Sequence, residues 1–446
     1  MRRHAWALGM ALALGCGKDN PGNPDAGNPD AGDPNSQSRF TRLVVDSDPS
    51  EFHLISSIAM AVGPQDRIGM AYFVKLTTKT NDAFDFELRY REFNAGTLGA
   101  AETVAKVQRV YGVSLAFGPD GQPALTYLGG GSDDSTFWWQ SDLAVAYRSA
   151  NGTWTQRIAV TRSNQAPGGN PVSDSGFLVG LNPSIVFSGN QALVAYRDGH
   201  QGQFPNQDWG PSDLELAVGG PTAWQARMLT PGGNDKLGWG AHISLIMAGN
   251  QPALVHDKAV EGAMASGTDV IFQRRNTDGS TWSAAVRVQA VSNTQLGASV
   301  AYDATAGFGI AVVDKVGDKL TYIECDESSA TKCTAASDWS SPDPVYNIGT
   351  GGWYPSLAFD PVNHEPSIAF YVCALESGRN DTSCNPGDDE LVVSTRISGI
   401  WREQLVDAGG GWSPKLAYLS NGKRVIMYRA PVVAPDSGTL KLAVEQ

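Results

Sequence analysis

Histidine, tyrosine and arginine side chains are the groups of this sequence best suited to proton transfer. An imidazole exchanges protons near neutral pH, and a neighbouring phenol or guanidinium can assist it. The residues that fit this chemistry are His242, His256, Tyr354 and Arg197. Together they would suit a lyase that abstracts a proton from a polyuronate. The alternative is structural, because isolated polar residues near strand ends commonly serve as hydrogen-bonding partners within a fold.

Aromatic side chains in predicted loops offer a second kind of chemistry, because exposed rings stack on sugars or fill pockets of a protein partner. The predicted ligand contacts are Trp138, Trp139, Trp209, Trp353 and His200. Trp353 has an alternative role, since Trp239, Trp353 and Trp412 each precede the first strand of a repeated unit. In that position an indole could form a structural wedge between units.

Carboxylates recur near the ends of the second strands of three consecutive units, at Asp198, Asp257 and Asp314. Such oxygens could coordinate Ca²⁺ together with loop carbonyls, or they could accept hydrogen bonds from backbone amides. No other metal site and no cofactor is predicted. The sequence has no phosphate-binding Walker loop, no GxSxG elbow and no HExxH motif.

These residues are carried by a repeat of about sixty residues, which divides most of the 446-residue chain into seven units. One apolar run in each unit aligns on Ser57, Ser114, Ser184, Ser244, Ser299, Ser356 and Lys415. A second run is continuously apolar, a third alternates, and a tryptophan introduces a fourth. Gly-rich turns separate the runs. Four antiparallel strands per unit predict an all-β fold, a seven-bladed β-propeller.

The two ends of the repeat region are predicted to meet in one sheet. The last unit ends after its third strand, whereas an unpartnered run at 40–46 resembles the fourth strand at 401–407. Phe40 takes the place of the repeat tryptophan. The N-terminal strand is therefore expected to complete the last blade and close the ring, which removes an exposed sheet edge. The alternative is six blades plus a degenerate unit.

The strand pattern SLAFDP…SIAFY…LVVSTR…W resembles that of secreted bacterial propellers of the sialidase-like, BNR-type superfamily. The resemblance covers about residues 40–446 and implies the fold rather than an activity. A sialidase of this superfamily would need three arginines on the substrate carboxylate. Arg197 and Arg429 follow second strands at equivalent positions, but no third arginine does.

Loop lengths indicate which face of the propeller binds. We label the strands of a blade A to D from the inside outward. The AB and CD turns on one face are mostly short, whereas the BC and DA connections on the other face are long. We therefore expect a surface-anchored recognition module that binds a glycan or a protein partner through its BC/DA face. The alternative is a carbohydrate-active enzyme, most plausibly a polysaccharide lyase and less so a sialidase-type glycosidase.

The first 38 residues are predicted to lie outside the propeller. Residues 1–15 have a basic start and an apolar core too short to span a bilayer, which is typical of a lipoprotein signal peptide ending at Cys16. Cleavage after Ala13 is the alternative. Residues 16–38 then form a lipidated cysteine and a disordered Pro/Gly/Asn/Asp tether, and 39–446 the propeller. The expected location is the bacterial outer membrane, on its periplasmic side or the cell surface.

Charge and cysteine content agree with an exported protein. The net charge is −13, and −15 without residues 1–15, which excludes nucleic acid as a partner and leaves the lipid as the sole membrane contact. The acidic background also disfavours a polyanion substrate. A monomer is expected. Four cysteines form two close pairs, Cys325 with Cys333 and Cys373 with Cys384, which predicts disulfides over the alternative of metal binding.

Overall fold

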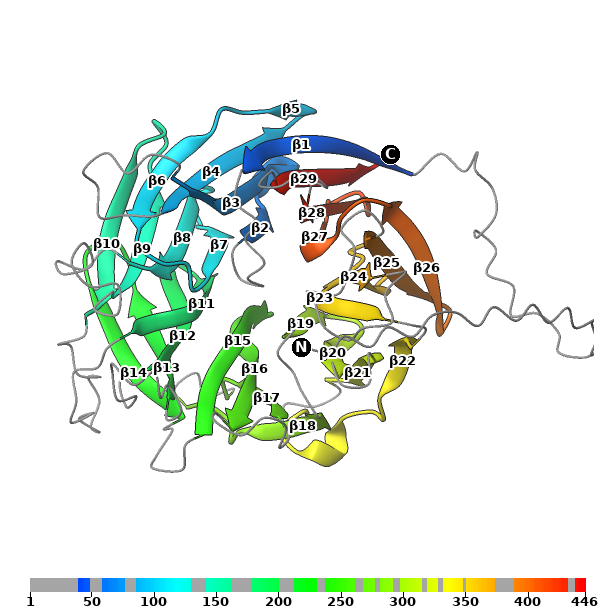
Figure 1. The fold of residues 1–446 in the computed structure, drawn as a ribbon. Helices are drawn as coiled ribbons and strands as arrows, with labels where there is room; N and C mark the ends of the chain where they lie inside the picture. The colour runs from blue at the N-terminus through cyan, green and yellow to red at the C-terminus, as the bar shows by residue number, and fades with distance from the viewer. Residues whose placement is uncertain are drawn as a thin grey trace, which may run out of the picture. The chain divides into compact units, whose positions relative to one another are not determined.

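The computed structural model describes a ring of small β-sheets. The described residues are 39–446 without 49–57, 77–85, 130–141, 162–177, 200–211, 231–236, 261–267, 277–280, 292–296, 315–318, 328–331, 348–349, 374–388 and 432–437. Within them, seven separate antiparallel sheets form, which confirms the seven-bladed prediction and excludes the six-bladed alternative. Figure 1 shows the sheets arranged radially, each with its first strand innermost.

The blades follow the chain in order, and the strands of each run from A on the inside to D on the outside. Blade 1 contains β2 (Ile58–Val62), β3 (Ile68–Lys75), β4 (Phe86–Asn94) and β6 (Glu102–Val107), and the short β5 (Thr97–Leu98) also pairs with β4. Blade 2 contains β7 (Val113–Phe117), β8 (Pro123–Leu128), β9 (Leu143–Arg148) and β10 (Trp154–Val160). Blade 3 contains β11 (Val179–Ser188), β12 (Gln191–Asp198), β13 (Asp213–Gly219) and β14 (Trp224–Thr230).

Blade 4 contains β15 (Leu237–Ala248), β16 (Gln251–Val260), β17 (Thr268–Arg274) and β18 (Val286–Val291), and blade 5 contains β19 (Ala298–Asp303), β20 (Gly307–Asp314), β21 (Lys319–Cys325) and β22 (Asp343–Tyr346). Blade 6 contains β23 (Gly351–Phe359), β24 (Pro366–Cys373), β25 (Asp389–Ile397) and β26 (Ile400–Asp407). Blade 7 contains β27 (Trp412–Tyr418), β28 (Arg424–Pro431), β29 (Gly438–Glu445) and β1 (Phe40–Asp48). Two short 3-10 helices, η1 (Pro64–Asp66) and η3 (Ala336–Asp338), lie between strands. Among the described residues, no helix has the length and apolar character needed to cross a membrane.

The hydrophobic core lies between neighbouring blades. Strand B of each blade has a sheet neighbour on both sides and another blade over each face, so its apolar run is continuous. Accordingly β8 is buried along its whole length, and β12 along all but its first residue. Strand C lies nearer the rim, and in β4 the buried and partly buried residues alternate at first. The inner strands contact one another in sequence, and β27 packs on β2 to complete the circle.

The last blade is completed by the N-terminal strand, as the sequence predicts. Strand β1 pairs antiparallel with β29, with Phe40 opposite Glu445. The carboxylate of Asp407, at the end of blade 6, holds this seam together. It accepts hydrogen bonds from Arg42 on β1 (2.9 Å), Tyr428 on β28 (2.5 Å) and Lys441 on β29 (2.8 Å). Both ends of the propeller chain are therefore tied to one acidic side chain as well as to each other.

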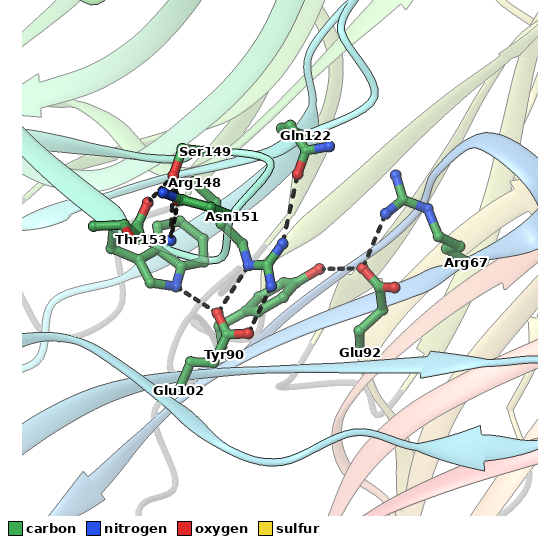
Figure 2. Close-up of polar contacts among 10 residues, drawn as sticks. Arg67, Tyr90, Glu92, Glu102, Gln122, Arg148, Ser149, Asn151 and Thr153 are labelled. Atoms are coloured by element: carbon green, nitrogen blue, oxygen red, sulfur yellow. Dashed lines mark hydrogen bonds and ion pairs between the residues drawn. The ribbon is translucent and has the colours of Figure 1, made fainter.

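The repeat tryptophan joins a blade to the one before it. In blade 2 the Trp154 ring meets the Tyr90 ring of blade 1 edge to face, with centroids 5.2 Å apart. Its indole N–H donates to Glu102 of blade 1 (2.8 Å), and Arg148 donates to both oxygens of the same carboxylate. Figure 2 shows Arg148 between Glu102 and Gln122. Trp154 is thus a structural wedge with a polar anchor, and so is Trp401, whose indole N–H donates to Asp343 (3.0 Å).

A second interblade device lies at the inner edge of the sheets. Strand A is the edge strand nearest the axis of the ring. Its N–H groups that point away from strand B therefore have no partner within their own sheet. A serine hydroxyl of the preceding blade accepts one such amide proton. The five bonds run from Ile185 to Ser114 (3.1 Å), Leu245 to Ser184 (3.0 Å), Val300 to Ser244 (3.4 Å), Leu357 to Ser299 (3.0 Å) and Leu416 to Ser356 (2.9 Å). We call these five serines the serine ring.

One predicted disulfide is confirmed. Cys325 and Cys333 are bonded, with Cα atoms 5.9 Å apart, and they tie the end of β21 to the connection that follows it. Cys373 at the end of β24 is also disulfide-bonded. Its predicted partner, Cys384, lies outside the described residues. The predicted signal peptide, Cys16 and the tether likewise fall outside them and stay predictions.

Candidate functional site

A cavity of about 200 Å³ lies at the centre of the ring and receives residues from all seven inner strands. Its lining consists of residues 58–60, 113–115, 182–184, 242–244, 297–299, 354–356 and Lys415. In blade 5 the lining begins at Gly297, immediately before β19 and therefore at the DA end of that strand. The cavity thus lies toward the BC/DA side of the channel. Its volume suits one small group of a longer ligand rather than a whole oligomer, since pockets for drug-sized ligands hold roughly 300–1,000 Å³.

A left-handed backbone residue recurs on the inner strands beside this cavity. Two residues before the aligned serine or Lys415, φ is positive in all six blades where that position is described: Gly112 (120°), Asn182 (49°), His242 (48°), Gly297 (81°), Tyr354 (57°) and Ser413 (52°). In blades 3, 4, 6 and 7 it coincides with a break in the register of strands A and B. Each break is a bulge, which re-aims a side chain.

Non-glycine residues adopt this left-handed backbone only where the surrounding fold enforces it. A non-glycine residue in the left-handed region costs about 1 kcal/mol or more, so it persists where the fold enforces it, commonly at ligand sites. Blades 2 and 5 avoid the cost with glycine. Blades 3, 4 and 6 instead carry Asn182, His242 and Tyr354, and all three side-chain types can hydrogen-bond. In these three blades the left-handed residue lines the cavity, whereas the equivalent Ser413 of blade 7 is buried and does not.

His242 is held in a defined orientation by a buried carboxylate. Its Nδ1 lies 2.7 Å from Oδ2 of Asp257 on β16. Asp257 is 1% exposed, whereas the His242 side chain is 23% exposed. A carboxylate at Nδ1 favours a proton on that nitrogen, which leaves Nε2 as the basic atom of the neutral ring. The pair is therefore arranged like a general base with its orienting acid.

The remaining titratable groups of the cavity are Tyr354 and Lys415. Tyr354 is 3% exposed, and its ring packs against Trp412, with centroids 5.6 Å apart. Lys415 is partly buried, and burial lowers the pKa of its ammonium to about 8. None of the described residues that line the cavity carries a carboxylate. The cavity therefore combines an oriented imidazole, a phenol and a cation.

Two of the four predicted proton-transfer residues do not line this cavity. His256 is fully buried, and this burial lowers its pKa to about 4, so its imidazole is neutral at physiological pH. Its Nδ1 lies 3.3 Å from the Gly240 amide nitrogen. Arg197 is 8% exposed, and its Nε donates to the Ser212 hydroxyl (2.7 Å). Both are packed within their blades, whereas His242 and Tyr354 line the cavity.

Of the predicted ligand contacts, only Trp353 lies within the described residues. Trp353 is fully buried and packs against Tyr371 of β24, with centroids 5.7 Å apart. It also belongs to a core cluster that includes Tyr322 of blade 5 and Trp412 of blade 7, as the alternative of a wedge between units predicts, so we leave Trp353 out of the proposed site. Outside the described residues are Trp138, Trp139, Trp209 and His200. Their role in binding stays a prediction.

The three carboxylates that could hold Ca²⁺ have different surroundings. Asp257 is engaged with His242, Asp198 is 7% exposed, and Asp314 ends β20. Across the described part of the chain, no group of three or more His, Cys, Asp or Glu side chains could hold a metal ion. Arg429, a candidate for a sialidase-type site, is 5% exposed and donates to the Phe73 carbonyl (3.1 Å).

Sequence reasoning missed Asn182 and Lys415 as site residues. Both signals lie in the repeat: Asn182 occupies the same unit position as His242 and Tyr354, and Lys415 interrupts the column of aligned serines. Comparing equivalent positions between units would have found them. What the sequence could not show is that this position is left-handed and borders the cavity.

No protein-family model and no curated protein matches the sequence. Solved structures are similar in fold. An ulvan lyase, described as a new family of polysaccharide lyase, is 11% identical over 89% of this chain and 96% of its own, with a TM-score of 0.55. The GH93 α-L-arabinofuranosidase of Fusarium graminearum is 11% identical (91% and 98% covered, TM-score 0.45). A Hadza microbial sialidase is 14% identical (79% and 73% covered, TM-score 0.46). At these identities the likeness shows the propeller fold alone.

Proposed function

We propose that this protein binds a polyuronate chain on its BC/DA face and cleaves it by β-elimination in the central cavity. The observation that carries the proposal is the His242–Asp257 pair, in which His242 has a left-handed backbone and lines a cavity that Tyr354 also lines. The propeller of the ulvan lyase supports the proposal as a precedent for lyase chemistry on this fold. The long BC and DA connections would hold the rest of the chain.

The chemistry assigned to these residues balances without a cofactor. Nε2 of His242 takes the proton from C5 of the uronate, and the electron pair of the C–H bond forms the C4=C5 double bond. The bond from C4 to the glycosidic oxygen breaks, and the Tyr354 phenol gives its proton to the leaving oxygen. Asp257 acts as a positioning residue, because it contacts Nδ1 of the imidazole and holds the ring in its orientation.

The test is the appearance of unsaturated product, followed by ultraviolet absorbance, when purified protein is mixed with a panel of polyuronates. His242→Ala should lower the rate by about 10²- to 10⁴-fold, the usual contribution of a general base. His364→Ala is the matched control, because His364 forms the same kind of pair, with Asp303 (2.9 Å), on an AB turn. Equal activity of the two variants, or no product from any polyuronate, would refute the proposed reaction.

A role in binding alone is the second candidate, and the limited size of the cavity is the observation that favours it. About 200 Å³ admits one group of a glycan, and the serine ring and Asn182 supply polar contacts even without a reaction. A glycan array with the purified protein tests this candidate. The Trp138→Ala/Trp139→Ala double variant should bind more weakly, and full retention of binding would place the contacts elsewhere.

We further propose that the protein acts at the bacterial envelope, anchored through Cys16. The support is the sequence of residues 1–16 and the disulfides, which form in oxidising compartments. Metabolic labelling with a fatty acid should mark the wild type and leave Cys16→Ser unlabelled. Labelling of both would contradict the anchor.

A further inference from the structure

The column of aligned serines contains one exception, and it lies in the cavity. Five blades present a hydroxyl that accepts an amide proton from the next blade, at 2.9 to 3.4 Å. Blade 7 presents Lys415 at the same position. An ammonium group donates and does not accept, so Lys415 cannot bond the next amide as the serines do. Its presence is therefore not explained by the interblade contact that the other blades make.

Lys415 also has no anionic partner in the described part of the chain. No described residue makes a hydrogen bond or an ion pair with its ammonium, and burial is the sole cause of its lowered pKa. Burying an ammonium without a partner costs several kcal/mol, which a fold does not normally retain without a use. The other titratable residues that line the same cavity are Tyr354 and His242, and Asp257 contacts the His242 imidazole.

We propose that Lys415 binds the carboxylate of the uronate unit that occupies the central cavity, and so makes the site specific for acidic over neutral glycans. The inference rests on the proposed function, because it places the sugar in that cavity. An ammonium is a compact charge suited to a single carboxylate. There it also stabilises the negative charge that develops on the carboxylate side of C5 as His242 removes the proton. The net negative charge of the whole chain opposes an anionic ligand, but the cavity lining contains Lys415 and no described carboxylate.

The experiment measures binding and not turnover. Glucuronate and glucose are titrated into the full chain and into Lys415→Ser, Lys415→Met and Lys415→Arg. Lys415→Ser is the decisive variant, because it supplies the hydroxyl that the serine ring has elsewhere and should fold as the wild type does. We expect wild type to bind glucuronate and not glucose, both neutral variants to bind glucuronate at least tenfold more weakly, and Lys415→Arg to retain part of the affinity.

A second measurement reports on the lysine itself. Nuclear magnetic resonance of the labelled lysine side chain should show titration near pH 8 without ligand and a clear upward shift of its pKa with glucuronate, because a bound carboxylate favours the charged form. Binding should therefore weaken as the pH rises above 8. The signal of Lys415 is identified as the one that is absent from the spectrum of Lys415→Arg.

The outcomes separate this inference from the proposed function. If Lys415→Ser binds glucuronate as tightly as wild type, or if wild type discriminates against glucuronate, the inference is overturned. If wild type binds glucuronate through Lys415 but no polyuronate is cleaved, the inference stands and the elimination reaction is refuted. Cleavage that is unaffected in Lys415→Ser would refute the inference and leave the reaction in place.

Discussion

Replacement of Ser184 by alanine tests the idea that the serine ring holds neighbouring blades together. The Ser184 hydroxyl accepts the amide proton of Leu245 at 3.0 Å, in a buried bond between blades 3 and 4. Alanine removes the acceptor and leaves the Leu245 amide buried without a partner. Such a group costs about 1–3 kcal/mol. Because the bond is fully enclosed, we expect Ser184→Ala to lower the free energy of unfolding by about 2 kcal/mol.

Two further serine variants serve as comparisons for the stability loss expected of Ser184→Ala. Ser244 accepts its amide proton at 3.4 Å in a partly buried bond, so Ser244→Ala should lose less, about 0.5–1 kcal/mol. Ser188 lies on the same strand as Ser184, and its hydroxyl makes no hydrogen bond with a described residue. Its alanine variant should therefore change stability by no more than about 0.5 kcal/mol.

Urea unfolding, with both fluorescence and circular dichroism as probes, measures these differences. The slope of the free energy with urea must stay constant between variants for midpoints to be compared. If Ser184→Ala loses no more than Ser188→Ala, or if Ser244→Ala proves the most harmful, the hydroxyl-to-amide bonds do not hold the blades together.

Three further predictions concern other contacts between or within blades. Replacing Cys325 and Cys333 by serine should cost about 2.5 kcal/mol by the chain-entropy estimate for their short loop, measured by urea unfolding with and without reductant. Glu102→Gln should cost about 1 kcal/mol at neutral pH: although burial opposes it, hydrogen bonds from Arg148 and Trp154 lower the pKa of Glu102. A depressed pKa contributes stability above the unfolded value of 4.5, so the difference from wild type should vanish as the pH falls below 4.5; a difference that persists in acid would contradict this. Asp407→Asn should cost about 2 kcal/mol and speed proteolysis of the N-terminal strand, and resistance equal to wild type would show that sheet pairing alone closes the ring.

The fold could be predicted from the sequence because the repeat supplies seven independent copies of one pattern. The likeness of residues 40–46 to 401–407 was sufficient to predict how the ring closes, since a strand that lacks a partner at each end of the chain has one simple solution. The pair Cys325 and Cys333 followed from proximity alone. In each case the deciding information is local or repeats at a fixed interval.

The site was harder because it depends on geometry that no single unit contains. His242 and Tyr354 lie more than a hundred residues apart, and the ring brings them to one cavity. His256 has the same side chain as His242 and lies fourteen residues further on, yet strand B buries it completely. Sequence patterns report the residue type, whereas the direction of a side chain at a bulge follows from backbone angles that the sequence does not reveal.

Closure of the last blade has a consequence for the order of events during synthesis. Strand β1 is among the first parts of the propeller to leave the ribosome, but its partner β29 ends at Glu445 and is among the last. Throughout elongation the first strand must therefore remain without its sheet. Blades 1 to 6 are each built from consecutive strands, but the circle closes only when the chain up to residue 445 is available. Until then β29 has an unpaired edge, to which a strand of another chain could pair. The interval before β1 pairs with β29 is therefore when this protein is most susceptible to mispairing.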